Sequence, residues 1–393
     1  MKKHICLFFI LLFLQHTLLR SQAVLNFQNL AHMNVGRALI GCAGDSNYFY
    51  VSNGFSSSSA YTALLERYDI ANNTWSQVTN LLLAKRYNSS ALIGNKLYVF
   101  NGILSNGAYN GNVEMVDLSN STVTLTSVNP NPVKTSGCAV WNGSIYIFGG
   151  STASGYSNAL HRLDPATNTW TQLANMPEAK ETTGEFVNGK LYVIGGYMGT
   201  TISNKIHVYD VQTDTWSALS SMPSAISGHS SAAYGSRIYT AFDYTYETYL
   251  GYYDIPSDTY TVLQQVNMHG RRNGGARIAR GKLYIMGGDT TSSALSCLSG
   301  LQVADLTGTT VVTGISIAEQ EASFEVYPNP ASDLLNLKNC PEGAEFTVYD
   351  INGKLLMQGK CEPQIRLTTL SKGIYTLRIS GVQQMYHKNF LIE

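Results

Sequence analysis

The chain has 393 residues, of which 44% are hydrophobic and 13% are Asp, Glu, Lys or Arg. The apolar share is sufficient for a folded core, which excludes long disorder, while the charged share is about half the usual one. Gly (35 residues) and Tyr (25 residues) are abundant, which favours short strands and tight turns over exposed charged helices. Acidic and basic side chains balance at 26 each, so net charge predicts neither nucleic acid nor an anionic membrane as a partner.

Residues 1–23 have the pattern of a signal peptide. Two lysines precede an apolar run over residues 5–14, and the segment ends in SQA (21–23), with small residues at the positions that a signal peptidase reads. Three polar residues interrupt the run before it reaches the roughly 20 apolar residues of a spanning helix: Gln15, His16 and Arg20. We therefore expect an exported chain with no transmembrane helix after cleavage.

A motif that recurs along residues 48–288 predicts the fold. It joins a short apolar strand with a central tyrosine to one or two glycines, as in SIYIFGG (144–150) and KLYVIGG (190–196). The aligned tyrosines stand 48, 48, 46, 47 and 45 residues apart: Tyr50, Tyr98, Tyr146, Tyr192, Tyr239 and Tyr284. A period in the forties with several short strands per repeat predicts a β-propeller, because a four-stranded blade buries its faces only against its neighbours. Six repeats predict six blades.

Two further markers follow the tyrosine. An Asp ends a later apolar strand in every repeat: Asp69, Asp117, Asp164, Asp210, Asp254 and Asp305. A Trp follows in three repeats: Trp75, Trp170 and Trp216. We expect the Asp carboxylate to accept backbone N–H bonds in a turn and the Trp to fill the gap between blades. Together these residues resemble the kelch repeat over about residues 24–310, which implies a kelch-type propeller and leaves its function open.

The repeats also depart from this pattern at several places. Ala241-Phe242-Asp243 stands where the fifth repeat should carry its glycines, and the sixth repeat has no Trp after its Asp. The segment VLNFQNLAHM (24–33) reads like the end of a repeat, with Phe27 in the place of the Trp. The N-terminal segment is therefore predicted to complete the last blade and close the ring.

Strand order predicts which face of the propeller binds a ligand. With strands a to d counted outward from the channel, the b-to-c loops and d-to-a connections share one face, and tight turns occupy the other. The b-to-c loops are rich in Ser, Thr, Gly, Asn and Tyr, which suit sugar rings or protein surfaces, although loops are commonly polar in any protein. The ligand-binding tyrosines predicted from these loops are Tyr61, Tyr109, Tyr156, Tyr197 and Tyr246.

Cations recur just before the predicted innermost strand. They stand twelve residues before the aligned tyrosine, or thirteen in the first repeat: Arg37, Arg86, Lys134, Lys180 and Arg272. Rotational symmetry would arrange them around one mouth of the channel, where they would grip a carboxylated sugar or acidic side chains. The alternative is that each cation pairs locally with backbone carbonyls or with a neighbour such as Glu181.

The sequence predicts no catalytic residue, no metal site and no other cofactor. His161 and His207 fall on different blades, and His229 and His269 lack a plausible third metal ligand. No Ser-His-Asp spacing, phosphate-binding glycine loop or nucleophile elbow is recognisable. The kelch family includes a copper oxidase and a sialic acid mutarotase. The mutarotase implies an alternative, an enzyme acting on acidic sugars, with the candidate acid/base carboxylates Glu181, Glu185 and Asp243.

From about residue 319 the period stops, and alternating strands around an Asn-Gly hairpin predict a small antiparallel β-sandwich. Its segments YPNP, VYDINGK, LSKGIYTLRI and KNFLI closely resemble the type A C-terminal sorting domain of type IX (Por) secretion substrates. That resemblance implies passage across a Gram-negative outer membrane, followed by release or surface attachment. Cys340 and Cys361 lie in this region, and we expect them to pair in an oxidising compartment.

Together these features predict an all-β protein with three parts: a signal peptide (1–23), a six-bladed kelch-type β-propeller (24–318) and a sorting domain (319–393). We expect the protein to be secreted or displayed on the outer surface of a Gram-negative bacterium. Its expected work is non-enzymatic recognition of a glycan or an extracellular protein, with the enzyme acting on acidic sugars as the alternative and a purely structural surface protein as a third class. The expected partners are that ligand and the type IX secretion machinery, and not nucleic acid.

Overall fold

The computed structural model describes residues 24–58, 60–290, 296–307, 325–338, 344–350, 355–380 and 385–392, and no helix occurs among them. The chain divides into two compact units, Met1–Thr313 and Gly314–Glu393. The predicted signal peptide, residues 1–23, lies outside the described residues.

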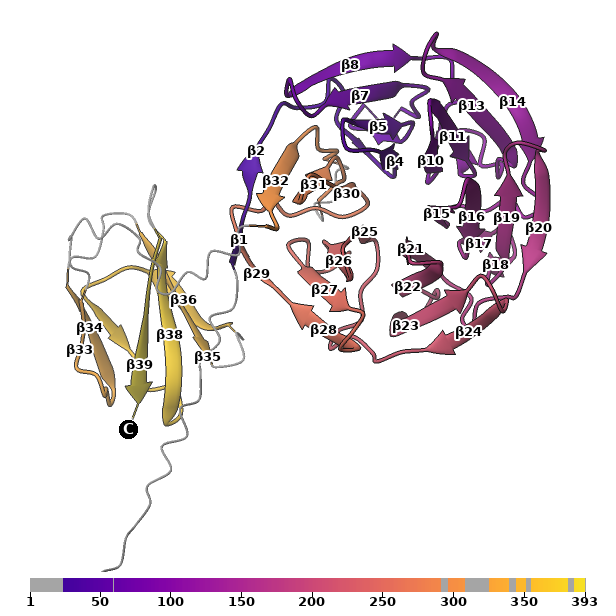
Figure 1. The fold of residues 1–393 in the computed structure, drawn as a ribbon. Helices are drawn as coiled ribbons and strands as arrows, with labels where there is room; N and C mark the ends of the chain where they lie inside the picture. Colours follow the sequence, from indigo (N-terminus) through magenta and orange to yellow (C-terminus); the bar gives the residue numbers. More distant parts are fainter. Residues whose placement is uncertain are drawn as a thin grey trace, which may run out of the picture. The chain divides into compact units, whose positions relative to one another are not determined.

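The described part of residues 24–307 contains six four-stranded antiparallel sheets, which form a ring around a central channel (Figure 1). From the channel outward, blades one to three consist of β4 (Gly41–Gly44), β5 (Tyr48–Ser52), β7 (Leu65–Asp69) and β8 (Thr74–Thr79); β10 (Ser89–Ile93), β11 (Lys96–Phe100), β13 (Asn112–Asp117) and β14 (Thr122–Val128); and β15 (Gly137–Trp141), β16 (Ser144–Phe148), β19 (Leu160–Asp164) and β20 (Thr169–Leu173). Blades four to six consist of β21 (Glu181–Val187), β22 (Lys190–Tyr197), β23 (Ile202–Asp210) and β24 (Thr215–Ala218); β25 (Ser230–Tyr234), β26 (Arg237–Ala241), β27 (Leu250–Asp254) and β28 (Thr259–Val262); and β30 (Gly275–Ala279), β31 (Lys282–Met286), β32 (Leu301–Asp305) and β2 (Gln28–Asn29). The all-β propeller predicted from the repeats is confirmed.

The core lies between neighbouring blades. Tyr50 of β5 packs in one cluster with Leu97 and Val99 of β11, and Tyr98 of β11 packs in the next cluster with Ile145 of β16. Each fully buried side chain of this size contributes about 1.5–3 kcal/mol relative to exposure. The repeat is therefore stable only as part of the ring, because one blade alone would expose both faces.

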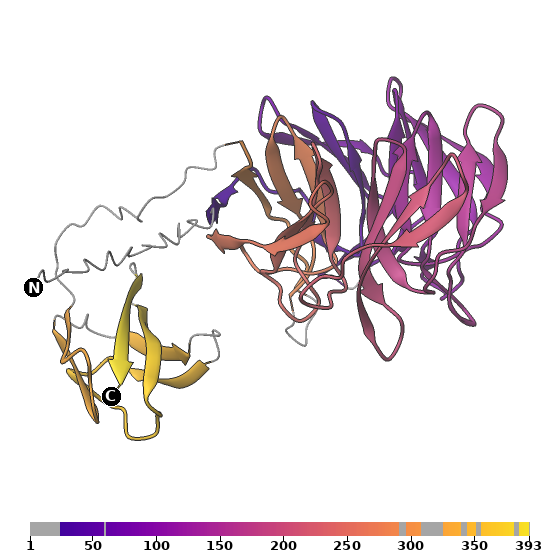
Figure 2. The same ribbon diagram turned by 60° about the horizontal axis from the view of Figure 1, so that its bottom comes forward.

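The N-terminal segment closes the ring as predicted. β2 pairs with β32 as the outer strand of blade six, and β1 (Val24–Asn26) pairs in parallel with β29 (Gln264–Val266). Phe27 is buried in a cluster with Leu250 and Leu283. The turned view in Figure 2 shows these first strands beside the last propeller strands.

The repeat markers take the structural roles expected of them. The Asp69 carboxylate accepts hydrogen bonds from the backbone N–H groups of Ala71 and Asn72, at 2.9 and 3.0 Å. The Trp216 indole donates to the carbonyl of Ala174 in the preceding blade, at 2.8 Å. Gly150 has φ +91°, and a Cβ there would lie 2.7 Å from the Lys134 carbonyl oxygen, so only glycine fits.

Blade five has no glycine pair, and a buried Phe and an Asp turn take its place. Phe242 adopts φ 54° and is buried, and the Asp243 carboxylate accepts three backbone N–H bonds, from Ser227, Thr245 and Tyr246. Asp243 therefore organises the b-to-c loop of this blade. Its occupied oxygens leave it little capacity to act as the acid/base group that the enzyme alternative requires.

Three short pairings lie on the loop face: β3 (Arg37–Ala38) with β6 (Phe55–Ser56), β9 (Lys85–Arg86) with β12 (Ile103–Leu104), and β17 (Ser151–Thr152) with β18 (Gly155–Tyr156). The third pairing makes a small hairpin of the b-to-c loop of blade three. In the first two pairings, the segment just before the innermost strand pairs with the segment that follows strand b of the same blade. The residues before the innermost strands are thereby fixed at the channel mouth.

The C-terminal unit contains two antiparallel sheets: β33 (Glu325–Tyr327), β34 (Leu334–Lys338) and β37 (Gln364–Arg366) in one, and β36 (Leu355–Lys360), β35 (Glu345–Asp350), β38 (Gly373–Ser380) and β39 (Met385–Ile392) in the other. Their buried side chains share one cluster that includes Leu335, Ile365, Val348 and Leu377. This is the predicted β-sandwich. Cys361 is disulfide-bonded, and its expected partner, Cys340, lies outside the described residues.

Candidate functional site

Two adjacent positions stand at the entry to each innermost strand, and backbone bonding identifies them. The second glycine of one blade donates its N–H to the carbonyl of the next blade, as from Gly54 to Lys85 (2.9 Å) and from Gly150 to Lys180 (2.8 Å). We call the accepting residue the inner position: Arg37, Lys85, Val133, Lys180 and Ile226. Arg271 is the equivalent residue of blade six, because Arg272 pairs with Asp289 as Lys134 pairs with Ser151. The following residue is the mouth position: Ala38, Arg86, Lys134, Glu181, Ser227 and Arg272. The predicted cations are divided between these two positions.

Arg37 and Lys180 occupy the inner position and do not reach the mouth, contrary to the expected ring of five cations. Arg37 Nη2 lies 2.7 Å from Glu66 Oε2, and both side chains are 0% exposed. The other terminal nitrogen of Arg37 donates to the carbonyls of Asn53 and Leu64. Lys180 Nζ is also buried and lies 2.8 Å from Glu178 Oε2. Local pairing, the alternative reading of the cation pattern, thus describes both residues.

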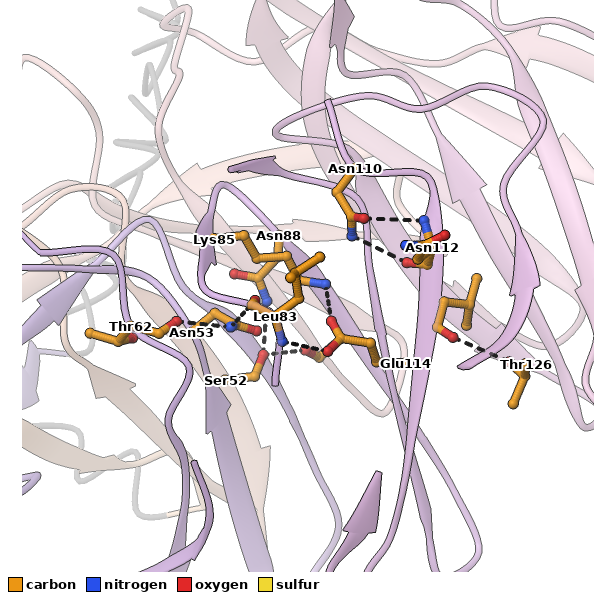
Figure 3. Close-up of polar contacts among 12 residues, drawn as sticks. Ser52, Asn53, Thr62, Leu83, Lys85, Asn88, Asn110, Asn112, Glu114 and Thr126 are labelled. Carbon is orange, nitrogen blue, oxygen red and sulfur yellow. Dashed lines mark hydrogen bonds and ion pairs between the residues drawn. The ribbon is translucent and has the colours of Figure 1, made fainter. Parts of the chain in front are cut away.

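Two further buried cations were not anticipated from the sequence. Lys85 Nζ lies 2.5 Å from Glu114 Oε2, and Glu114 Oε1 also accepts the N–H of Leu83 (Figure 3). Arg271 donates to Gln302 Oε1 at 3.1 Å. Both partners stand three residues before the repeat Asp, as Glu66 does. A search for acids at that offset would have found the first pair.

The mouth position holds three of the predicted cations. Arg86 stacks against the rings of Phe55, Tyr61 and Tyr87, at 5.1, 5.1 and 5.2 Å. Lys134 Nζ lies 3.8 Å from Glu181 Oε1.

Arg272 lies 4.0 Å above the Tyr244 ring, with its Nε 3.5 Å from Asp289 Oδ2. Each mouth cation therefore contacts an aromatic ring, and Lys134 and Arg272 also lie near a carboxylate.

A cavity of about 340 Å³ opens at this mouth, and we call it the mouth pocket. It is lined by Tyr87, Lys134, Thr135, Tyr156, Glu181, Thr182, Tyr197, Ile202, Ser227, Gly228, His229, Tyr244 and Asn273. Four tyrosine rings and one ion pair surround a concave space of the size that holds small ligands. The pocket brings together Lys134, Tyr156 and Tyr197 from the predicted set, and it adds Tyr87 and Tyr244, which the sequence had not singled out.

Glu181 and His229 are the carboxylate and the imidazole among the residues that line the mouth pocket. Burial raises the pKa of Glu181, while the bond from the Ser151 hydroxyl at 2.6 Å and the charge of Lys134 act in the opposite direction. Burial lowers the pKa of His229 to about 4, so the ring is neutral at physiological pH. Its Nε2 donates to the Ile194 carbonyl at 3.0 Å, which makes Nδ1 an acceptor. Among the described residues, this Nδ1 has no hydrogen-bond partner.

The remaining predicted tyrosines lie outside the mouth pocket. Tyr61 packs edge-on against Phe55 beneath Arg86, and the Tyr109 hydroxyl donates to the Thr152 carbonyl at 3.0 Å. Tyr246 is exposed on the blade-five loop. These three residues lie on the loop face outside the pocket. Tyr156 and Tyr197 form an edge-to-face pair in the pocket wall, with ring centroids 5.8 Å apart.

Farther along the channel lies a cavity of about 140 Å³ that shares Thr135, Thr182 and His229 with the mouth pocket. Glu185 and Arg277 line this cavity and the next one, with Oε1 and Nη1 3.8 Å apart.

The thiols of Cys42 and Cys138 also line the channel cavity and are free. Burial raises the pKa of Cys138 to about 12, which keeps the thiol protonated and unreactive.

Glu185 predicts a pH-dependent stability. Burial raises its pKa from 4.5 to about 7, so between these values the native state holds a proton that the unfolded chain has released. Stability therefore falls as the pH rises through that window. The free energy of unfolding of Glu185→Gln minus that of the wild type should therefore increase by about 1–3 kcal/mol from pH 4 to pH 8. Thermal unfolding of both proteins at the two pH values measures this difference. A difference between the two proteins that is the same at both pH values would contradict the assignment.

No group of three or more His, Cys, Asp or Glu side chains that could hold a metal ion occurs among the described residues. Within that same part of the chain, no helix has the length and apolarity needed to cross a membrane.

Among the described residues, the fold and its loop face define a six-bladed propeller with a ligand-sized pocket at the channel mouth. Residues 38–241, more than half of the chain, match the KLHDC2/KLHL20/DRC7 Kelch-repeats domain, so the chain belongs to the kelch-repeat family. Residues 325–393 match the secretion system C-terminal sorting domain, which indicates export by the type IX system to the cell surface or the medium. No curated protein matches the chain.

Proposed function

We propose that the exported propeller is a carbohydrate-binding module whose ligand occupies the mouth pocket. The observation that carries this proposal is a concave cavity of about 340 Å³ walled by tyrosine rings. Flat aromatic faces contact the C–H faces of sugars, and the flanking hydroxyl and amide groups offer neutral hydrogen bonds. A protein partner would need about 800 Å² of surface on each side, and the pocket itself favours a smaller group.

The charges of the pocket refine this proposal. Lys134 and Glu181 form an ion pair that is only partly exposed, with side-chain exposures of 28% and 17%. Such a pair offers donors and an acceptor to ligand hydroxyl groups on neighbouring carbons. The remaining mouth cations, Arg86 and Arg272, keep the rim attractive to an acidic substituent. The proposed ligands therefore include sugars that carry a carboxylate.

The tyrosine pair provides the test. Replacing both Tyr156 and Tyr197 by Ala should weaken glycan binding about tenfold, because each lost ring contact contributes about 0.5–1.5 kcal/mol. The measurement is a glycan array with the purified secreted protein, followed by calorimetric titration of the strongest hit. Tyr234→Ala is the matched control: this tyrosine is 40% exposed and lies at the a-to-b turn on the opposite face. Equal losses in both proteins, or no glycan bound by the wild type, would contradict the proposal.

An enzyme acting on acidic sugars is the second candidate, and Glu181 is the observation that favours it. Its carboxylate faces the mouth pocket with a raised pKa, as an acid/base group requires. NMR of sialic acid anomers with and without the protein separates the two functions. Faster interconversion that Glu181→Gln abolishes would establish turnover, and an unchanged rate would leave binding alone.

A further inference from the structure

A ring of backbone hydrogen bonds surrounds the channel just inside the mouth. Its members each follow the mouth position of their blade and adopt φ between 52° and 61°: Leu39, Tyr87, Thr135, Gly228 and Asn273. Each N–H donates to the carbonyl of the member in the preceding blade where both exist: Tyr87 to Leu39 (2.8 Å), Thr135 to Tyr87 (3.1 Å), Asn273 to Gly228 (2.9 Å) and Leu39 to Asn273 (2.9 Å). Left-handed residues that are not glycine cost about 1–2 kcal/mol each, so this ring is a specific feature of the fold.

Blade four lacks its member. In blade three, Lys134 pairs with Ser151 and Gly137 with Phe148, which leaves two residues between them. In blade four, Glu181 pairs with Tyr197 and Thr183 with Ile194, which leaves only Thr182. Thr182 is part of a bulge and turns its hydroxyl to the carbonyls of Ile194 and Gly195. One residue is therefore missing from the ring.

The gap leaves two backbone groups without a partner among the described residues. A sixth member would donate its N–H to the Thr135 carbonyl and accept the N–H of Gly228. Both residues line the mouth pocket, together with Thr182. The Thr135 hydroxyl and His229 Nδ1 also have no hydrogen-bond partner within the described part of the chain. The pocket thus contains a donor and an acceptor that, in a complete ring, would bond to the two ends of one residue.

We propose that the glycan ligand carries an N-acetylated amino sugar whose acetamido group takes the place of the missing residue. A trans secondary amide points its N–H and its C=O in opposite directions, as a helical residue does. The acetamido N–H donates to the Thr135 carbonyl, and the acetamido oxygen accepts the Gly228 N–H. This assignment rests on the proposed carbohydrate function and names the chemical class of the ligand.

The surroundings of the gap suit the acetyl methyl group. A Cβ placed on Gly228 would lie 3.5 Å from the Tyr244 side chain, so an aromatic wall stands beside the free N–H. Tyr87 supplies a second ring next to Thr135, to which its carbonyl is bonded. The pocket therefore offers an apolar surface within reach of both polar groups of the gap.

The ligand arm of the test uses the wild-type secreted protein. Titration with N-acetylglucosamine and N-acetylgalactosamine, followed by ligand-observed NMR, should show binding at least tenfold tighter than with glucosamine, glucose or galactose. Two lost hydrogen bonds of ordinary strength produce a change of that size. Equal binding of the sugars without the acetamido group would overturn this inference and leave the carbohydrate function standing. Failure to bind any sugar, on this panel or on a glycan array, would remove the carbohydrate function itself.

A glycine residue capped at both ends, N-acetylglycine methylamide, separates a peptide from a sugar as the source of the secondary amide. Binding of this compound with no binding of the acetylated sugars would assign the gap to a peptide and overturn the sugar assignment.

The protein arm fills the gap. Insertion of one glycine between Glu181 and Thr182 restores two residues at this place in blade four, so the ring can close on itself. Binding of N-acetylglucosamine should fall at least tenfold while the melting temperature stays the same or rises. The matched control is the same insertion in the Asn188-Gly189 turn on the opposite face, which should leave binding unchanged. Undiminished binding in a folded insertion variant would overturn the assignment, and if the variant does not fold, the ligand arm decides.

Discussion

Replacing Glu114 by Ala is expected to lower the free energy of unfolding by about 3–5 kcal/mol. Lys85 Nζ lies 2.5 Å from Glu114 Oε2, and the two side chains are 0% and 3% exposed (Figure 3). The substitution leaves the ammonium buried without a counter-charge and removes the acceptor of the Leu83 N–H, at 2.6 Å. Burial already lowers the pKa of Lys85, while Glu114 raises it. The loss should appear as a lower melting temperature in scanning calorimetry.

An exposed ion pair is the control for this prediction. Lys190 Nζ lies 3.3 Å from Asp210 Oδ2, with side-chain exposures of 50% and 29%. Lys190→Ala should cost no more than about 1 kcal/mol, because solvent screens the pair. The double variant Lys85→Val with Glu114→His should recover most of the Glu114→Ala loss, because it copies blade three, which holds Val133 and His161 at these places. Equal losses in the exposed and buried variants would contradict the role assigned to burial.

The buried pairs explain why the cation pattern of the sequence was only partly informative. Counting twelve residues back from the aligned tyrosine treats Lys180 and Lys134 as equivalent. Blade four is one residue short at the start of its innermost strand, so Lys180 falls at the inner position and Glu181 at the mouth. The repeat spacing shortens from 48 to 46 residues at this blade, but a spacing does not locate a deletion within a repeat. Backbone pairing was needed to align the two blades.

The fold was more accessible from the sequence than the pocket. Apolar strands, the glycine pair and the Asp turn recur because every blade packs against its neighbours in the same way. This repetition makes the motif recognisable in the sequence. The mouth pocket depends instead on how far each irregular loop reaches over the channel. Composition indicated tyrosine-rich loops, but it did not distinguish Tyr156, which lines the pocket, from Tyr109, whose hydroxyl bonds to a neighbouring loop. Tyr244 was missed because its place depends on the Asp243 turn that replaces the glycines.

Ring closure provides the second large effect. Phe27→Ala should destabilise the propeller by about 3–5 kcal/mol, the range for removing a fully buried Phe side chain. Phe27 is 2% exposed and packs with Leu250 and Leu283, and its N–H donates to the Val266 carbonyl at 3.1 Å. β2 pairs with β32 through two residues, and the Leu30 N–H also donates to the Leu301 carbonyl at 2.9 Å, so backbone bonding and side-chain burial together hold this outer strand. The measurement is urea unfolding followed by tryptophan fluorescence.

Leu81→Ala is the control for closure, since Leu81 is 72% exposed and its removal should change stability by no more than about 0.5 kcal/mol. Deleting residues 24–33 extends the test, because it removes β2 and leaves β32 as an unpaired outer edge of blade six. An unpaired edge recruits strands from other molecules, so the deleted protein should associate in light scattering at concentrations where the full chain does not. A deleted protein that stays unassociated and as stable as the full chain would show that the remaining strands hold the ring without this segment.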